Sequence, residues 1–372
     1  MLLHNIEHFD YYYFPDYLPE WVKTLDTHVW NTMFVLFSGK AYAIFAVLFG
    51  FTFFLMDRKQ RAKGIQFGPR FLWRMLLLFA FGIVNSMFYS GDVLALYAVL
   101  GFSLVLVSNL RSTSVLVIAL VLFIQPFEIG RLIYMLLNNS YAPGEPLSWH
   151  YFGKSTEYLS SHSFIDTAWG NLTNGRWACT LWSWEHGRIF QVPALFMVGF
   201  VLGRASRFED TKINRRFWVK MLLIAFNLVI LFVALLNLAN ELIHSEIIVS
   251  QIGLLIETWN NVAVTFIWIP AFVLLFYTPA ANKLLSRFEV FGKMSLTNYV
   301  MQSVLGCMIY NACGLGLYQY TGASLSLLVG IILFVIQYKF CVWWLEKHKQ
   351  GPLEGLWHKL TWINLKKEFS LA

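Results

Sequence analysis

The sequence has 372 residues, of which 58% are apolar and only 13% are charged. A soluble domain carries roughly a quarter charged residues, so this composition excludes a water-soluble globular fold and predicts a protein dissolved in the lipid bilayer. The net charge of +7 does not predict nucleic-acid binding, because the basic residues are split among several connections and form no single stripe.

The first nine residues contain a polar trio, His4, Glu7 and His8. On a helix, His4 and His8 are four residues apart and share a face, with Glu7 beside them. A carboxylate can hold an imidazole in one tautomer, as a general base requires, and a histidine can also carry an acyl group. The alternative is a polar cap where a helix leaves the membrane. The same letters match the inverted zincin pattern H-x-x-E-H, but no third ligand is evident, so no metal is expected.

Apolar runs long enough to cross the bilayer recur along the whole chain. Because lipid offers no partner to the backbone, these runs must be helices, and about 20 residues suffice for each. The predicted spans are 29–56, 72–90, 92–109, 112–137, 188–206, 217–240, 251–277, 294–317 and 323–345. The first is overlong and is interrupted at 38–40, which predicts a broken or re-entrant segment. The fold class is therefore all-α, a polytopic bundle of about nine complete helices.

Lysine and arginine give the bundle an orientation, because cytoplasmic loops are enriched in both. Most of the 28 basic residues fall at 57–74, at Arg111, at 204–220, at 283–293 and after Glu346. These connections are predicted to be cytoplasmic, together with an amphipathic tail at 347–372. The connections at 9–28, 90–92, 138–187 and 241–250 are predicted to face outward, the third as the one large outward loop of a single domain, 1–372. With 9–28 outside, we expect a first helix that is truncated in this chain, unless the short N-terminus crosses unaided.

Polar side chains within or beside the spans are candidate functional groups, since they are costly in lipid. Asp92 lies in a tight turn, where it could serve chemistry or cap the next helix. The candidate substrate-binding residues are Lys40, Glu185, His186, Arg188, Gln191, Asn298 and Gln302. The alternatives are interfacial anchoring for the charged residues and interhelical hydrogen bonding for Asn298 and Gln302. The four scattered cysteines suggest neither a disulfide framework nor a zinc site.

Five stretches in order resemble the YeiB-type multi-pass membrane protein family, which carries a DUF418 domain. They are "FSGKAYAIFAVLFGFTFFLMDRK" (38–59), "SGDVLALYAVLG" (90–101), "ALFMVGFVLGR" (194–204), "FGKMSLTNYVMQS" (291–303) and "GPLEGLWHKLT" (351–361). The family is similar to transmembrane acyltransferases that include the heparan glucosaminide N-acetyltransferase. The YeiB-type family usually opens with a helix that has an acidic residue and an Arg-Gly pair, and this chain lacks both.

The resemblance implies transfer of an acyl group from cytoplasmic acyl-coenzyme A, as a co-substrate and not a bound cofactor, to an outward glycan or similar acceptor. His4, His8, Glu7 and Asp92 are the residues expected to carry this chemistry. A transporter and a non-catalytic membrane scaffold are the alternatives, and no inverted repeat is evident to favour transport. The resemblance also implies the bacterial inner membrane, with a cytoplasmic C-terminus. The acyl group, the acceptor and the oligomeric state do not follow from the sequence.

Overall fold

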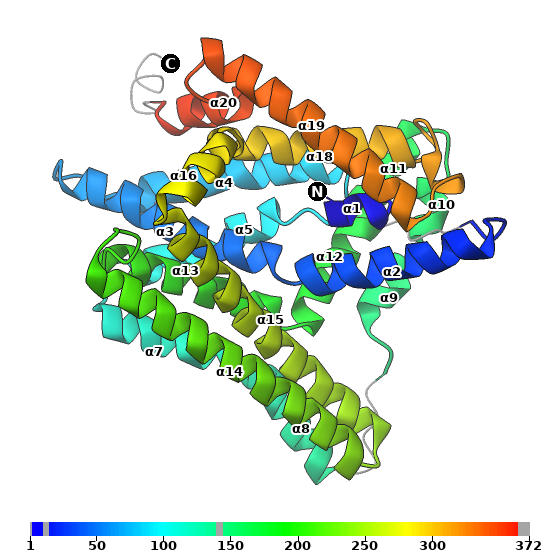
Figure 1. Ribbon diagram of the computed structural model, residues 1–372, viewed down its shortest axis with the longest axis horizontal. Coiled ribbons are helices and arrows are strands. Elements are labelled where there is room, and N and C mark those ends of the chain that lie inside the picture. Colours follow the sequence, from blue (N-terminus) through cyan, green and yellow to red (C-terminus); the bar gives the residue numbers. More distant parts are fainter. Residues whose placement is uncertain (1, 10–14, 139–143, 364–372) are drawn as a thin grey trace, which may run out of the picture.

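The computed structural model describes residues 2–9, 15–138 and 144–363, and every regular element in these ranges is a helix. The first half contains α1 (Leu2–Ile6), α2 (Glu20–Phe37), α3 (Ala41–Arg61), α4 (Gly68–Ser86), α5 (Leu94–Leu100), α6 (Phe102–Val107), α7 (Ser112–Phe123), α8 (Pro126–Leu137), α9 (Leu147–Phe152), α10 (Ser155–Leu159) and α11 (Phe164–Gly170). The second half contains the π-helix η1 (Asn171–Gly175), α12 (Arg176–Glu185), α13 (Arg188–Arg204), α14 (Lys212–Leu242), α15 (Glu246–Phe276), α16 (Pro279–Leu285), η2 (Ser286–Phe288), α17 (Glu289–Lys293), α18 (Ser295–Tyr310), η3 (Leu317–Gln319), α19 (Ala323–Lys347) and α20 (Pro352–Thr361). The all-α class predicted from composition is confirmed (Figure 1).

Five helical segments of the described chain are long and apolar enough to cross a membrane, or six if the bent α11–α13 pair counts as one span. The five are Glu20–Arg61, Ser112–Leu137, Lys212–Leu242, Glu246–Phe276 and Ala323–Lys347. The predicted total of nine is not confirmed, because the runs 72–90, 92–109 and 294–317 form helices outside this set. The last run, for example, forms α18 of only 16 residues, which is shorter than a complete span.

The predicted interruption of the first span is present between α2 and α3. Gly39 adopts a φ of +71°, a left-handed conformation that favours glycine. A Cβ at this position would lie 2.7 Å from the side chain of Asn261 on α15. The turn therefore needs glycine both for its backbone angle and for the close approach of α15.

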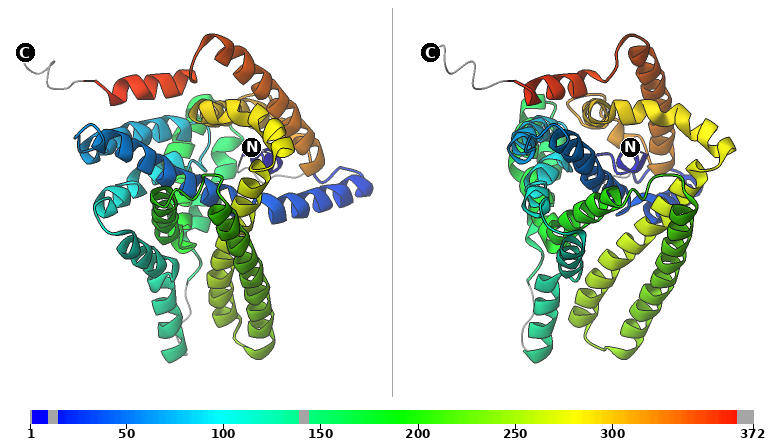
Figure 2. Two further views of the ribbon diagram at one scale, coloured as in Figure 1. Left: turned by 60° about the vertical axis from the view of Figure 1, so that its left-hand side comes forward. Right: turned by 90° about the vertical axis from the view of Figure 1, so that its left-hand side faces the viewer.

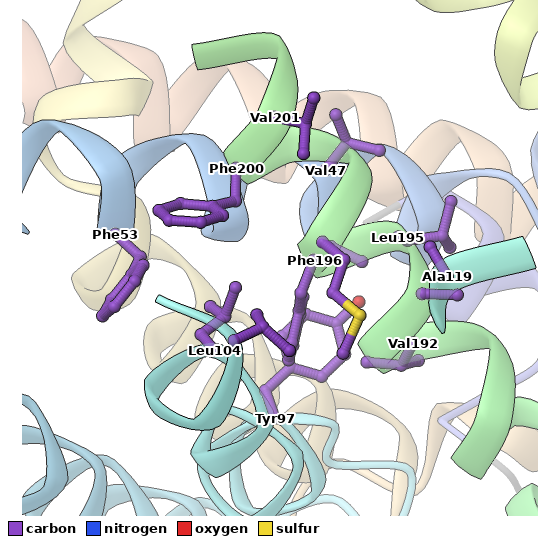
Figure 3. Close-up of a cluster of buried hydrophobic side chains, with 14 of the residues drawn as sticks. Val47, Phe53, Tyr97, Leu104, Ala119, Val192, Leu195, Phe196, Phe200 and Val201 are labelled. Carbon is purple, nitrogen blue, oxygen red and sulfur yellow. The ribbon is translucent and has the colours of Figure 1, made fainter. Parts of the chain in front are cut away.

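Helices α3 and α13 cross at the centre of the hydrophobic core, where backbone meets backbone. A Cβ on Gly50 would lie 1.8 Å from the carbonyl oxygen of Phe196, and one on Gly199 would lie 1.9 Å from that of Val47. Small residues permit such close packing of helices in membranes. Figure 3 shows Val47 and Phe53 of α3 beside Phe196 and Phe200 of α13. This crossing positions α13, whose first residue is Arg188.

Helices α14 and α15 form a hairpin of two adjacent helices that projects away from the rest of the molecule (Figure 2). Each helix has 31 residues and is therefore about 47 Å long. Rows of large apolar side chains on α14 are exposed, including Leu223, Leu231 and Leu238. A surface of this kind is stable against lipid and not against water.

The basic connections gather at one end of the bundle. The end of α3 and the beginnings of α7 and α14 lie on the left of Figure 1, whereas the α14–α15 turn and the start of α2 lie on the right. The C-terminal helix α20 lies at the same end as the basic connections and packs on α4. The tertiary structure thus separates 57–74 and 204–220 from 241–250, as the charge pattern predicts.

The segment 138–187, expected as an outward loop, consists mainly of helices where it is described. Helices α9 and α10 are short, whereas α11, η1 and α12 form one continuous helical run. This run meets α13 at an angle of 72° at a break that contains Gly187, whose φ is +65°. By length and composition the pair is a broken span or a re-entrant loop.

Candidate functional site

His4 forms the centre of a small network at the N-terminal helix. Its Nδ1 lies 3.2 Å from the Glu7 carboxylate and 2.9 Å from the Tyr89 hydroxyl. Because a carboxylate only accepts hydrogen bonds, Glu7 favours the tautomer with the proton on Nδ1. Nε2 is then the basic nitrogen, and it has no hydrogen-bond partner among the described residues. The imidazole is 36% exposed and Glu7 only 8%, so the buried carboxylate supports an accessible ring.

His8 lies elsewhere, and the expectation that it shares a helical face with His4 is wrong. Helix α1 ends at Ile6, and His8 and Phe9 have φ values of +48° and +53°. This turn carries the His8 ring away from the helical register. His8 is fully buried, with Nε2 2.9 Å from the Ser326 hydroxyl and 3.1 Å from that of Thr321. These contacts anchor the N-terminal segment to the start of α19.

Asp92 is buried in the turn between α4 and α5. Its carboxylate accepts hydrogen bonds from the Ala95 backbone N–H at 3.1 Å and from the Asn85 amide at 3.0 Å. The guanidinium of Arg176, at the start of α12, lies 3.5 Å away and also donates to the Ser86 hydroxyl at 3.0 Å. Asp92 therefore caps the first turn of α5, as one of the two interpretations predicts, and it also pairs with a cation.

Arg188, the first residue of α13, is sandwiched between two aromatic rings. Its guanidinium carbon lies 4.2 Å from the ring centre of Tyr42 and 4.0 Å from that of Trp182. No carboxylate of the described residues forms an ion pair with it, and the groups within its electrostatic reach include Tyr97, Cys179 and Tyr89. Stacking leaves the N–H edges of the planar fork available to an anionic group.

Gln191, one turn into α13, ties the Arg188 region to α3 and α15. Its side chain accepts a hydrogen bond from the Tyr42 hydroxyl and donates one of 2.9 Å to the Thr258 carbonyl. The Tyr97 hydroxyl donates to the Tyr42 carbonyl at 2.5 Å. These bonds hold Tyr42 in place as one wall of the Arg188 sandwich.

Other predicted site residues make local contacts. Glu185 accepts from the backbone N–H of Ser148 at 3.2 Å and from its hydroxyl, which ties α12 to α9. His186 stacks on Trp182 at 4.3 Å and bonds its carbonyl. Lys40 lies at the α2–α3 break within electrostatic reach of Glu257.

The two predicted site residues on α18 contact the neighbouring helix α19. The Asn298 amide donates to the Met294 carbonyl at 2.8 Å and contacts the Cys341 sulfur at 3.1 Å. Gln302 donates to the Gln337 side chain on α19 at 3.3 Å. Both contacts with α19 fit the alternative interpretation, in which these side chains form hydrogen bonds between helices.

The groups that remain form three local networks. Tyr89 contacts His4 and lies three residues before Asp92 in the chain, Asp92 pairs with Arg176, and Arg188 lies between Tyr42 and Trp182. His8, Asn298 and Gln302 make their contacts elsewhere. Sequence reasoning missed Tyr89, Arg176, Tyr42 and Trp182; tyrosine next to "SGD" and arginine opening a Trp-rich stretch were the signals available. No group of three or more potential metal ligands occurs among the described residues.

The fold defines the class of the molecule as a polytopic, all-helical membrane protein. Residues 202–364 match the family described as "Protein of unknown function (DUF418)". This match confirms the predicted resemblance to the YeiB-type DUF418 family.

Three relatives support this resemblance. The chain is 24% identical to uncharacterized protein YxaH of Bacillus subtilis (strain 168), over 98% of this chain and 91% of that protein. It is also 24% identical to an uncharacterized 39.9 kDa protein in the amylase 3' region of Bacillus acidopullulyticus, over 93% and 88%. Uncharacterized protein YeiB of Escherichia coli (strain K12) is 34% identical over 83 residues, 21% of each chain. No solved structure matches.

Proposed function

We propose that this protein is a membrane-embedded acyltransferase that moves an acyl group from cytoplasmic acyl-coenzyme A to an outward-facing glycan or similar acceptor. The observation that carries the proposal is the His4–Glu7 pair, in which a buried carboxylate contacts Nδ1 of a partly exposed imidazole. That arrangement suits a general base, because the carboxylate orients the ring and stabilises the cation formed on proton uptake.

In the proposed reaction, His4 Nε2 takes the proton from an acceptor hydroxyl or amine. The acceptor atom attacks the thioester carbonyl carbon, the carbon–sulfur bond breaks, and coenzyme A leaves as its thiolate, which is then protonated. Arg188 suits the negative charge that develops on the carbonyl oxygen, since its fork is held by stacking and not neutralised by a carboxylate. Asp92, bound to Arg176 and to the Ala95 backbone N–H, stabilises the α4–α5 turn.

The separation of charge along the bundle supports the orientation that this reaction needs. Arg58 and Arg61 lie in the last turn of α3, and Arg61 and Arg204 both donate to the Ser108 carbonyl. The phosphates of coenzyme A would approach this basic end from the cytoplasm. The C-terminus lies at the same end in this proposal, and the membrane is the bacterial inner membrane. The acceptor then reaches His4 from the opposite, outward-facing side of the membrane.

The test uses inside-out membrane vesicles that contain the full chain, with acetyl-coenzyme A labelled on its acetyl group added outside. The measured quantity is label covalently bound to envelope glycans within the lumen. We expect H4A to lower this transfer by at least 100-fold, because a general base contributes 10²–10⁴-fold. The matched control is H244A, since His244 is an exposed histidine in the α14–α15 turn.

Equal loss in H4A and H244A, or no transfer by the wild-type chain at matched expression, would overturn the proposal. Unmodified solute accumulating in the lumen without acyl transfer would instead identify a transporter. Transfer that survives H4A but fails in H8A would move the base to the buried histidine, against the geometry described above.

A further inference from the structure

Two cysteines meet at the end of α18 that lies opposite the basic connections. Cys307 is in the last turn of the helix and fully buried, whereas Cys313, in the turn that follows, is partly exposed. Their sulfur atoms lie 4.0 Å apart. A disulfide needs about 2.05 Å, so the two sulfurs must approach by roughly 2 Å, a movement within the reach of side-chain rotation.

The backbone holds this pair together independently of the sulfur contact. The Leu315 N–H donates to the Met308 carbonyl at 2.8 Å, and the Gly314 N–H donates to the Asn311 carbonyl at 3.0 Å. A Cβ on Gly314 would lie 2.1 Å from the Met308 carbonyl oxygen. Glycine therefore lets the chain fold tightly back on the last turn of α18, and this fold brings Cys313 over Cys307.

The same turn is a junction between three parts of the molecule. The Ala312 N–H donates to the Leu159 carbonyl of α10 at 3.2 Å, and the His162 Nδ1 lies 3.1 Å from the Ala312 carbonyl. The segment continues to Thr321 and Ser326, whose hydroxyls contact His8. A disulfide here would hold α10, α18 and the segment that contacts His8 in one arrangement.

We propose that Cys307 and Cys313 are a disulfide-forming pair that closes when the outer end of the protein meets an oxidising environment. The oxidant is a disulfide of the thiol–disulfide exchange class. The exposed Cys313 thiolate attacks it and releases one thiol, and Cys307 loses its proton and displaces the second thiol from the mixed disulfide. The two cysteines are oxidised by two electrons and the oxidant is reduced to two thiols. The location of the pair outside the cytoplasm rests on the orientation in the proposed function.

The test is differential thiol labelling of the full chain, first purified in detergent and equilibrated with oxidised glutathione. Free thiols are blocked with N-ethylmaleimide, disulfides are reduced, and the released thiols receive a second label that mass spectrometry locates. We expect Cys307 and Cys313 to take the second label together, while Cys179 and Cys341 are not released. In C313S, Cys307 should no longer be released, and a C179S/C341S variant should behave as the wild type does.

Failure of Cys307 and Cys313 to be released together, or crosslinks between chains in place of an internal one, would overturn the proposal. Labelling in intact cells separates this result from the proposed function. If the pair forms in purified protein but stays reduced in cells, and only a membrane-permeant reagent reaches Cys313, the orientation is wrong and the pairing stands. Acyl transfer is not part of either readout.

Discussion

The guanidinium of Arg74 on α4 lies 3.4 Å from the ring centre of Trp357 on α20, and the Trp357 indole N–H donates to the Arg74 carbonyl at 3.1 Å. Together with the Trp73 indole, which donates to the Leu360 carbonyl at 3.0 Å, this contact fixes the C-terminal helix on the bundle. The Glu354 carboxylate accepts from Thr297 on α18 at the other side of α20. Helix α20 thus joins α4 to α18.

W357A should release this helix. The variant loses a cation–π contact, a hydrogen bond and a partly buried ring, so we expect a fall of about 2–4 kcal/mol in the free energy of unfolding. Thermal unfolding in detergent measures the loss, and limited proteolysis after Lys347 should detect the freed segment. W343A is the matched control, because Trp343 on α19 is 53% exposed. An unchanged proteolysis pattern in W357A would contradict the docking.

G199A should disrupt the crossing of α3 and α13. The added methyl group would overlap the Val47 carbonyl oxygen, so the helices must separate or the protein must fail to assemble, at a cost above about 3 kcal/mol. Size-exclusion elution in detergent and the melting temperature report this directly. The control is G130A on α8, where a Cβ meets no atom within 4 Å and where alanine favours the helix. Equal stability of the two variants would show that the crossing is looser than described.

D92N should destabilise the α4–α5 turn. The amide cannot neutralise Arg176, and the loss of one member of a buried ion pair costs about 3–5 kcal/mol, less here because Arg176 is 20% exposed. We expect a fall of about 2–3 kcal/mol, measured by thermal unfolding. D166N is the control, since Asp166 is exposed on α11. If the double variant D92N/R176Q is as unstable as the sum of the single variants, the pair is not coupled.

R188K should separate the role of a planar cation from that of charge alone. Lysine retains the charge but loses the stacking between Tyr42 and Trp182 and the fork of N–H donors. We expect acyl transfer to fall by at least 10-fold with little change in melting temperature. R131K, at a partly exposed site on α8 outside the basic connections, provides the comparison. Wild-type transfer by R188K would remove Arg188 from the proposed chemistry.

Sequence reasoning alone could predict the carboxylate of Asp92 in a tight turn, the broken first span and the family resemblance. Asp92 was identified because a charge between two apolar runs is energetically costly unless it is paired or functional. The 38–40 interruption was identified because glycine stands between polar residues in an apolar run. The pairing of His4 with His8 failed because α1 ends at Ile6, and a helix of five residues gives no periodic signal by which its end can be placed.

The amino-acid sequence by itself determined that this chain is a helical membrane protein with its basic residues at one end, because lipid forces each apolar run to satisfy its own backbone hydrogen bonds. Only the tertiary structure decided which polar groups meet. Tyr89 reaches His4, Arg176 reaches Asp92, and Tyr42 and Trp182 enclose Arg188 through contacts between segments distant in sequence. Such contacts depend on how helices cross, and hydropathy along one chain carries no information on which helices meet.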